Sequence, residues 1–219
     1  MSRSRSARRG FTIAEMLSVA FVMGLVMTAV ALAIGPLVNA QNRTQAKVDT
    51  VQAVAMALYR VERDLRSTKS DSVWACTTSG TPTCTAPTAS LGATDAIVIA
   101  TAYANGTGQF QVDSSNGKPN WQGAAVYWVD SSGYLNFAFD FPTASGYSTG
   151  NLLSAADARV AVSDVLAAGG KQLAQPIEQM SIAVPPSTAN KVSFQLQTTA
   201  TEGASSNELT LQTDLETRN

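Results

Sequence analysis

One uncharged stretch near the amino terminus constrains this chain more than any other feature. Residues 16–38 contain no Asp, Glu, Lys or Arg and are rich in Ala, Val, Leu and Met. A helix over this stretch would be about 34 Å long at ~1.5 Å per residue. Such a helix can cross the hydrocarbon core of a bilayer. The stretch therefore predicts a membrane-spanning helix, or one buried in an equally apolar environment.

The charges before this stretch predict its orientation. Four arginines and no acidic residue occupy the first ten positions: Arg3, Arg5, Arg8 and Arg9. Because positive charge is retained on the cytoplasmic side, we expect residues 1–10 to stay in the cytoplasm and everything beyond Val38 to be exported.

Glu15 does not fit a simple membrane anchor, because its carboxylate lies directly before the apolar run. A charge at the centre of a membrane helix costs roughly 2.5–3.5 kcal/mol on insertion scales, and less near the interface. We therefore expect Glu15 to have a partner.

The segment Arg8-Arg9-Gly10-Phe11-Thr12-Ile13-Ala14-Glu15, followed by a long apolar helix, resembles the type IV prepilin signal. The resemblance implies that a prepilin peptidase cleaves between Gly10 and Phe11 and that Phe11 becomes N-methylated. It also implies that Glu15, as the fifth residue of the mature chain, pairs with the terminal amine of a neighbouring subunit during assembly. The implied partners are other pilin or pseudopilin subunits, the peptidase and an inner-membrane assembly platform.

Two further segments indicate which group within the pilin superfamily the chain resembles. Both Val61-Glu62-Arg63-Asp64-Leu65-Arg66 and the ending Leu215-Glu216-Thr217-Arg218-Asn219 resemble J-type minor pseudopilins of type II secretion and W-type minor pilins. The first segment also has a purely structural role, because Arg60 with Asp64 and Glu62 with Arg66 are i,i+4 ion pairs that stabilise a helix by about 0.2–0.5 kcal/mol each.

The predicted fold is α+β and type IV pilin-like. A cytoplasmic leader (1–10) precedes a long helix (11–68), whose transmembrane or fibre-core segment covers about 16–38, and an exported β-rich head (69–219). We expect Gly35-Pro36 to loosen or kink the helix. Apolar residues at three- and four-residue spacing should pack its second half on an antiparallel sheet: Val48, Val51, Val54, Ala55, Leu58, Val61 and Leu65.

The amino terminus is also compatible with two simpler kinds of segment. A secretory signal peptide could end at Val38-Asn39-Ala40, although its apolar region usually spans only ~7–15 residues. A plain single-pass anchor accounts for the length but for neither Gly10 nor Glu15.

Composition limits the function classes. From residue 70 onward, five basic residues stand against twelve acidic ones, which argues against direct nucleic-acid binding. The chain has no histidine, and this excludes a Ser-His-Asp triad, a Cys-His dyad and any His-ligated zinc site within it. We expect no enzymatic activity and no cofactor.

Cys76 and Cys84 are the only cysteines and lie on the predicted exported side. We expect a disulfide between them, with two free thiols or a metal site as alternatives.

The head should be mostly strands and turns. We expect a loop over 68–87, strands at 97–103 and 110–112, a hairpin of 125–129 with 134–139, a helix within 152–168, and strands at 177–184, 192–196 and 209–215, the last two paired. Residues 113–117 could form a partial calcium loop but fit a turn better. The large aromatics should lie in the core, with a carbohydrate- or partner-binding patch as the alternative: Trp121, Tyr127, Trp128, Phe137 and Phe139.

Together these features predict a structural subunit, more specifically a minor, tip or priming component, of a type IV pilus or type II secretion pseudopilus. It would span the inner membrane once before assembly, with its amino terminus in the cytoplasm and its head exported, and later lie in the pilus or pseudopilus. The alternative is a membrane-tethered protein whose exported head binds a ligand.

Overall fold

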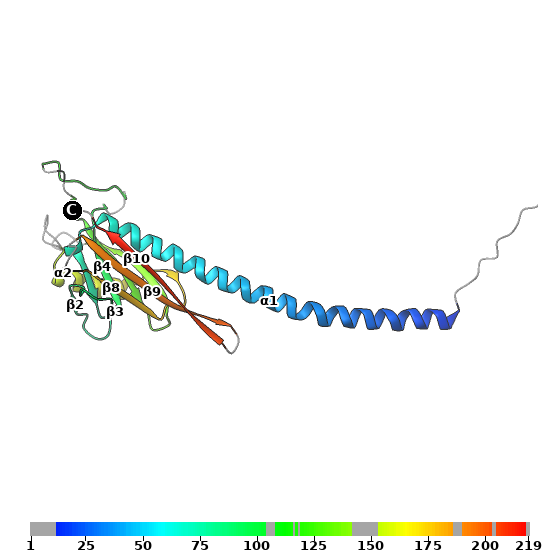
Figure 1. The fold of residues 1–219 in the computed structure, drawn as a ribbon. Coiled ribbons are helices and arrows are strands. Elements are labelled where there is room, and N and C mark those ends of the chain that lie inside the picture. The colour runs from blue at the N-terminus through cyan, green and yellow to red at the C-terminus, as the bar shows by residue number, and fades with distance from the viewer. Residues whose placement is uncertain are drawn as a thin grey trace, which may run out of the picture. The chain divides into compact units, whose positions relative to one another are not determined.

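The computed structural model describes residues 12–103, 108–115, 117, 119–141, 153–185, 190–202 and 205–217 (Figure 1). The chain forms two compact units, residues 1–46 and 47–219, and the second is the head. Its elements, in chain order, are α1 (Ile13–Ser67), η1 (Ser70–Ser72), β1 (Val73–Cys76), β2 (Cys84–Thr85), β3 (Gly92–Thr94), β4 (Ala96–Thr101), β5 (Gly123–Val129), β6 (Leu135–Asp140), α2 (Ala155–Ala168), β7 (Lys171–Ala174), β8 (Gln179–Ala183), β9 (Lys191–Glu202) and β10 (Ser205–Glu216).

The predicted α+β class is confirmed: a long amino-terminal helix is combined with antiparallel sheets. Helix α1 has 55 residues and stays helical through Gly35 and Pro36, where we expected it to loosen or kink. It does not melt there, and the kink stays a prediction. From Lys47 onward it belongs to the head, and its buried positions follow helical spacing: Val54, Ala57, Val61, Asp64 and Leu65. Val48 and Ala55, which we expected to face the sheet, are exposed. Ala55 follows Val54 directly, and one residue turns a helix through about 100°, so the two cannot share a buried face.

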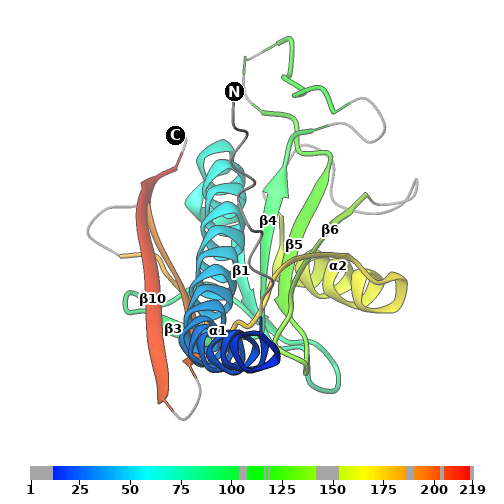
Figure 2. The same ribbon diagram turned by 90° about the vertical axis from the view of Figure 1, so that its right-hand side faces the viewer.

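The head contains two antiparallel sheets. One has six strands in the order β2-β1-β4-β5-β6-β7, and the other has four in the order β10-β9-β8-β3. The main core cluster joins the buried side chains of α1 to residues from both sheets. A second cluster joins α2 to the opposite face of the six-stranded sheet. Figure 2 shows this arrangement, with the head part of α1 beside strands of both sheets and α2 against the far side of β4, β5 and β6.

The central strands β4 and β5 alternate between these two clusters. Ile97, Ile99 and Tyr127 face α1, whereas Val98 and Trp128 face α2, because successive side chains point to opposite faces of a strand. All six residues of β4 are therefore buried. Of the aromatics predicted in the core, Tyr127, Trp128 and Phe137 are buried, and Phe139 and Trp121 are half-buried against the two clusters.

The predicted hairpin of β5 and β6 is confirmed, with Tyr127 opposite Phe137 and Val129 opposite Leu135. Its turn is built by Asp130, whose carboxylate accepts hydrogen bonds from the backbone of Ser132 and Tyr134 and from the amide of Asn136. Burial by itself would raise the pKa of Asp130, but these hydrogen bonds lower that pKa below its ordinary value. The β9–β10 pair and helix α2 are confirmed as well.

Three local expectations were wrong or incomplete. Residues 73–76 and 84–85 are strands rather than loop. Pairing of β1 with the buried strand β4 outweighs its Ser- and Thr-rich flanks, and β2 pairs with β1. Residues 110 and 112 make only isolated bridges. Strand β7 was not anticipated. The described part of the expected turn, residues 113–115, is present, and the Asp113 carboxylate accepts hydrogen bonds from the backbone and side chain of Ser115.

A buried carboxylate ties α1 to the six-stranded sheet. Asp64 is 3% exposed. Its Oδ1 lies 2.9 Å from the guanidinium of Arg63, and its Oδ2 accepts a 2.6 Å hydrogen bond from the hydroxyl of Tyr127 on β5. Burial and the nearby Asp64 carboxylate raise the pKa of the Tyr127 hydroxyl far above its usual value, so the tyrosine stays a donor.

Of the two ion pairs predicted for this part of α1, one is present. Glu62 and Arg66 pair at 2.7 Å. Arg60 does not pair with Asp64 as expected; its guanidinium carbon lies 3.7 Å from the ring centroid of Phe137. Asp64 points into the core toward Tyr127, where Arg63 reaches it and Arg60 packs on the neighbouring ring.

Replacing Tyr127 by Phe should destabilise the head by about 1–3 kcal/mol, because Oδ2 of Asp64 would remain buried without its donor. The measurement is denaturant unfolding of the full chain in detergent, followed by tryptophan fluorescence. Tyr134→Phe is the matched control, since the Tyr134 hydroxyl makes no hydrogen bond to the described residues, and it should change stability little. Equal stability of Tyr127→Phe and the unmodified chain would contradict a stabilising role for this bond.

Candidate assembly site at the amino-terminal helix

The residues predicted to be processed and to assemble lie at the start of α1. Gly10 and Phe11, the predicted cleavage and methylation positions, fall outside the described residues. Thr12 and Glu15 are described and lie directly before and in the first turn of α1.

Thr12 and Glu15 form reciprocal hydrogen bonds. The carboxylate oxygen Oε2 of Glu15 accepts hydrogen bonds from the backbone nitrogen of Thr12 at 2.8 Å and from its hydroxyl at 3.0 Å. The hydroxyl in turn accepts a 3.3 Å hydrogen bond from the backbone nitrogen of Glu15. This is a capping box, which satisfies donors that the first turn of a helix leaves unpaired. Among the described residues, the partner of Glu15 is therefore Thr12.

The capping box leaves part of the carboxylate available. Both hydrogen bonds go to Oε2, and within the described part of the chain no donor reaches Oε1 of Glu15. Glu15 is also exposed. An ammonium group from another chain could thus approach Oε1 without breaking the cap. The predicted pairing with a neighbouring terminal amine stays a prediction.

The helix that follows Glu15 has an apolar surface that is exposed in the described part of the chain. All residues from 12 to 49 are exposed, including Leu17, Phe21 and Leu32 at 66–73%. The most apolar window of α1 has a mean hydropathy of 2.5, and the helix is long and apolar enough to cross a membrane. Because exposing this area to water is unfavourable, the segment needs lipid or other helices around it.

The polar side chains within this segment suit such surroundings. Ser18 donates to the carbonyl of Ala14 and Thr28 to the carbonyl of Gly24, at 2.9 and 2.8 Å. A hydroxyl satisfied in this way does not need water. At Gly24 an added Cβ would meet nothing within 4 Å, so a helix from another molecule could approach closely there.

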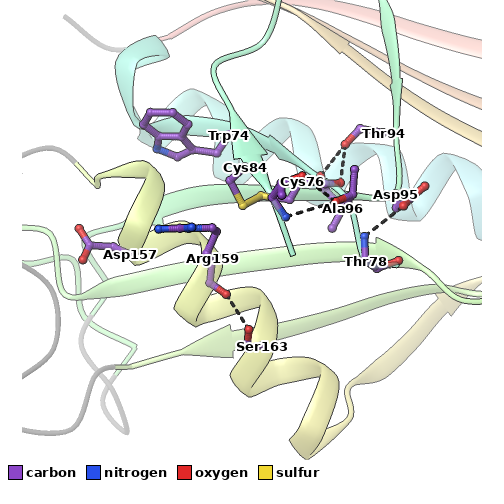
Figure 3. The surroundings of a disulfide bond; sticks show 12 residues. Trp74, Cys76, Thr78, Cys84, Thr94, Asp95, Ala96, Asp157, Arg159 and Ser163 are labelled. Atoms are coloured by element: carbon purple, nitrogen blue, oxygen red, sulfur yellow. Dashed lines mark hydrogen bonds between the residues drawn. A yellow bond between two sulfur atoms is a disulfide. The ribbon is translucent and has the colours of Figure 1, made fainter. Parts of the chain in front are cut away.

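In the head, the predicted disulfide is present between Cys76 and Cys84 (Figure 3). These residues are direct partners in the β1–β2 register, and Cys76 is buried beneath α2. Two neighbouring contacts fix the surrounding backbone. The indole nitrogen of Trp74 donates to the carbonyl of Leu153 just before α2, and the hydroxyl of Thr94 donates to the carbonyl of Cys76.

The head also contains a cleft of about 570 Å³ near the β5–β6 turn. It is lined by Thr78, Ala93, Thr94, Asp95, Val129, Asp130, Ser131, Glu178, Gln179 and Met180. All three carboxylates already accept hydrogen bonds, Asp95 from Thr78, Asp130 within its turn, and Glu178 from Thr199. Among the described residues, no three His, Cys, Asp or Glu side chains are grouped so that they could hold a metal ion.

Sequence reasoning named Thr12 and Tyr127 but did not foresee their contacts with Glu15 and Asp64. The contact of Thr12 could have been foreseen, because Thr-x-x-Glu before an apolar run is a capping-box signature. The contact of Tyr127 could not, since its partner Asp64 lies 63 positions earlier in the chain. Comparison of the chain with protein-family models, curated proteins and solved structures gives no match. What the protein does must be inferred from its own residues and geometry.

Cleaving or removing the Cys76–Cys84 disulfide should destabilise the head by about 2–3 kcal/mol, as the chain-entropy model gives for so short a loop. The measurement compares unfolding of the unmodified chain with that of Cys76→Ala combined with Cys84→Ala. Mass spectrometry after alkylation checks the bond itself: the unreduced chain should take up no iodoacetamide and the reduced, unfolded chain two equivalents. Alkylation without reduction would show that the bond is absent.

Proposed function

We propose that this protein is a structural subunit, specifically a minor, tip or priming component, of a type IV pilus or type II secretion pseudopilus. The observation that carries the proposal is the start of α1. There, a capped glutamate, one of whose carboxylate oxygens has no donor among the described residues, precedes a helix whose apolar side chains are exposed. Such a helix suits a molecule that leaves lipid to pack among identical or related helices.

The proposed sequence of events follows from the charges. The chain inserts with residues 1–10 in the cytoplasm, and removal of this leader creates a new amino terminus at Phe11, four residues before Glu15. In an apolar fibre core, both the ammonium of one subunit and the Glu15 carboxylate of its neighbour would be costly when unpaired. Their pairing removes both costs and sets the axial stagger between subunits. The energy for extraction from the membrane comes from an assembly ATPase and platform elsewhere.

The segment Val61–Arg66 supports the minor-subunit part of the proposal through its resemblance to J- and W-type subunits. Its residues also have structural roles in this chain. Val61, Asp64 and Leu65 lie in the core, and Glu62 pairs with Arg66. The segment therefore contributes to docking α1 on the head, which any subunit of this architecture needs.

The amino-terminal mass of the protein from its native host tests the proposal directly. We expect a chain that begins at Phe11 and carries one methyl group on its amino nitrogen. Intact mass and amino-terminal sequencing give both answers. A chain that begins at Gln41 would mean a secreted domain, and an unprocessed chain a simple anchor; either result would contradict the proposal.

Substitution of Glu15 separates capping from assembly. Glu15→Gln keeps an oxygen that can accept the Thr12 hydrogen bonds but removes the charge that would pair with an amine. We expect Glu15→Gln and Glu15→Ala both to insert in the membrane and to be lost from assembled fibres. Gln52→Ala, at an exposed position of the same helix, is the control and should assemble normally. The readout is the amount of each variant in sheared fibres or in crosslinked complexes with neighbouring subunits.

A membrane-tethered binding protein is the second candidate, and the cleft of about 570 Å³ in the head favours it. In that case α1 is only an anchor, and Glu15 serves only to cap it. Glu15→Gln would then behave like the unmodified chain in every assay, whereas substitutions in the cleft would abolish ligand binding.

A further inference from the structure

The two sheets of the head end in four edge strands, and three of these are short. Strand β2 has two residues, β3 has three and β7 has four. Short edges are one of the ways by which proteins avoid pairing with other chains. The fourth edge strand, β10, has twelve residues and pairs with β9 without a bulge over its whole length. Figure 2 shows β10 at the outer side of its sheet.

The hydrogen-bond register shows which backbone groups of β10 face outward. The backbone nitrogen of Thr217 donates to the carbonyl of Asn190, and this pair continues the β9–β10 register. Bonded and non-bonded pairs alternate in an antiparallel ladder. Odd-numbered residues of β10 therefore bond to β9, and the even-numbered ones turn their N–H and C=O groups to the free edge. Those with described side chains are Glu208, Thr210, Gln212, Asp214 and Glu216.

No described residue hydrogen-bonds these outward backbone groups. Of the features by which edge strands avoid pairing, β10 has acidic side chains but no bulge. It contains no proline and no lysine. On the face toward the core, Leu209 and Leu211 are only half-buried, so apolar area at the edge is left uncovered. A further strand would cover it.

The opposite face of β10 is acidic and determines which strand fits. Glu208, Asp214 and Glu216 are exposed there. Glu208 accepts a hydrogen bond from Gln197 and Asp214 one from Gln212, and hydrogen bonds from Ser193 and Gln212 lower the pKa of Asp214. A second copy of β10 paired antiparallel about Gln212 would place Glu208 opposite Glu216. Like charges directly opposite are destabilising, so the acidic face disfavours self-pairing in this register.

We propose that β10 is a docking edge for an extended strand from a different protein, in which basic and apolar residues alternate. Its backbone would pair with the outward groups of residues 208–216. Its basic side chains would lie beside Glu208, Asp214 and Glu216, and its apolar side chains beside Leu209 and Leu211. The inference is independent of the proposed pilus or pseudopilus role, because an anchored binding protein could use the same edge.

The test uses the full chain in detergent and a nine-residue peptide in which lysine and valine alternate. Residue-resolved amide exchange by NMR should show the even-numbered amides from 208 to 216 becoming protected when the peptide is added, with the odd-numbered ones unchanged. A glutamate–valine peptide should bind at least about tenfold more weakly. A lysine–valine peptide whose alternate nitrogens are methylated should not protect these amides.

Two variants separate strand pairing from charge attraction. Gln212→Pro removes one outward N–H that makes no hydrogen bond to a described residue, and edge positions of this kind tolerate proline. It should weaken binding of the lysine–valine peptide about tenfold, whereas the control Gln212→Ala, which keeps the N–H, should bind normally. Equal binding by both variants, or peptide binding without protection of the even-numbered amides, would overturn the proposal.

Discussion

The head forms around the last turns of α1, because both sheets bury their inner faces against the same stripe of side chains. Val54, Ala57, Val61 and Leu65 are all less than 3% exposed, and they contact residues from strands of both sheets. The outer face of the six-stranded sheet is closed by α2, whereas the outer face of the four-stranded sheet carries polar side chains such as Gln195, Gln212 and Asp214. The position of α1 therefore determines where both sheets lie.

Within this packing, the hydrogen bond between Asp64 and Tyr127 fixes the position of α1 along the sheet. Apolar side chains could slide along the sheet by a turn at modest cost, but a buried carboxylate must meet its donor. The hydrogen bond from Tyr127 and the pairing with Arg63 fix Asp64 at one place. Arg60, one turn earlier, packs its guanidinium on Phe137 beside the same tyrosine. A polar contact in the core thus selects one register of α1 on β5 and β6.

Much of the fold could be predicted from the sequence, because its strongest patterns are local. Each of these patterns lies within a short stretch of sequence. The apolar run indicates a long helix, Asp130 and Gly133 indicate the β5–β6 turn, and the alternation of apolar and polar residues indicates β9 and β10. The candidate site was partly predictable: Glu15 was singled out by its charge, but its partner was sought in another chain, although Thr12 lies three residues away. Strand β1 and the choice of Arg63 over Arg60 were not predictable. The strand and the ion pair each depend on contacts with residues far away in the sequence. A segment of four residues such as Val73–Cys76 is too short to show a strand periodicity of its own.

The boundary between the two units of the chain lies inside α1, after Ala46, rather than in a linker. Proteases usually separate a membrane segment from an exported domain at an exposed, irregular connection, and α1 offers none between its apolar part and the core. A cut after Ser67, where the helix ends, would remove Val54, Ala57, Val61 and Leu65 and open the inner faces of both sheets. Only cleavage before Val54 would release a head that keeps its core, so any naturally shed form of this protein should retain the last turns of the helix.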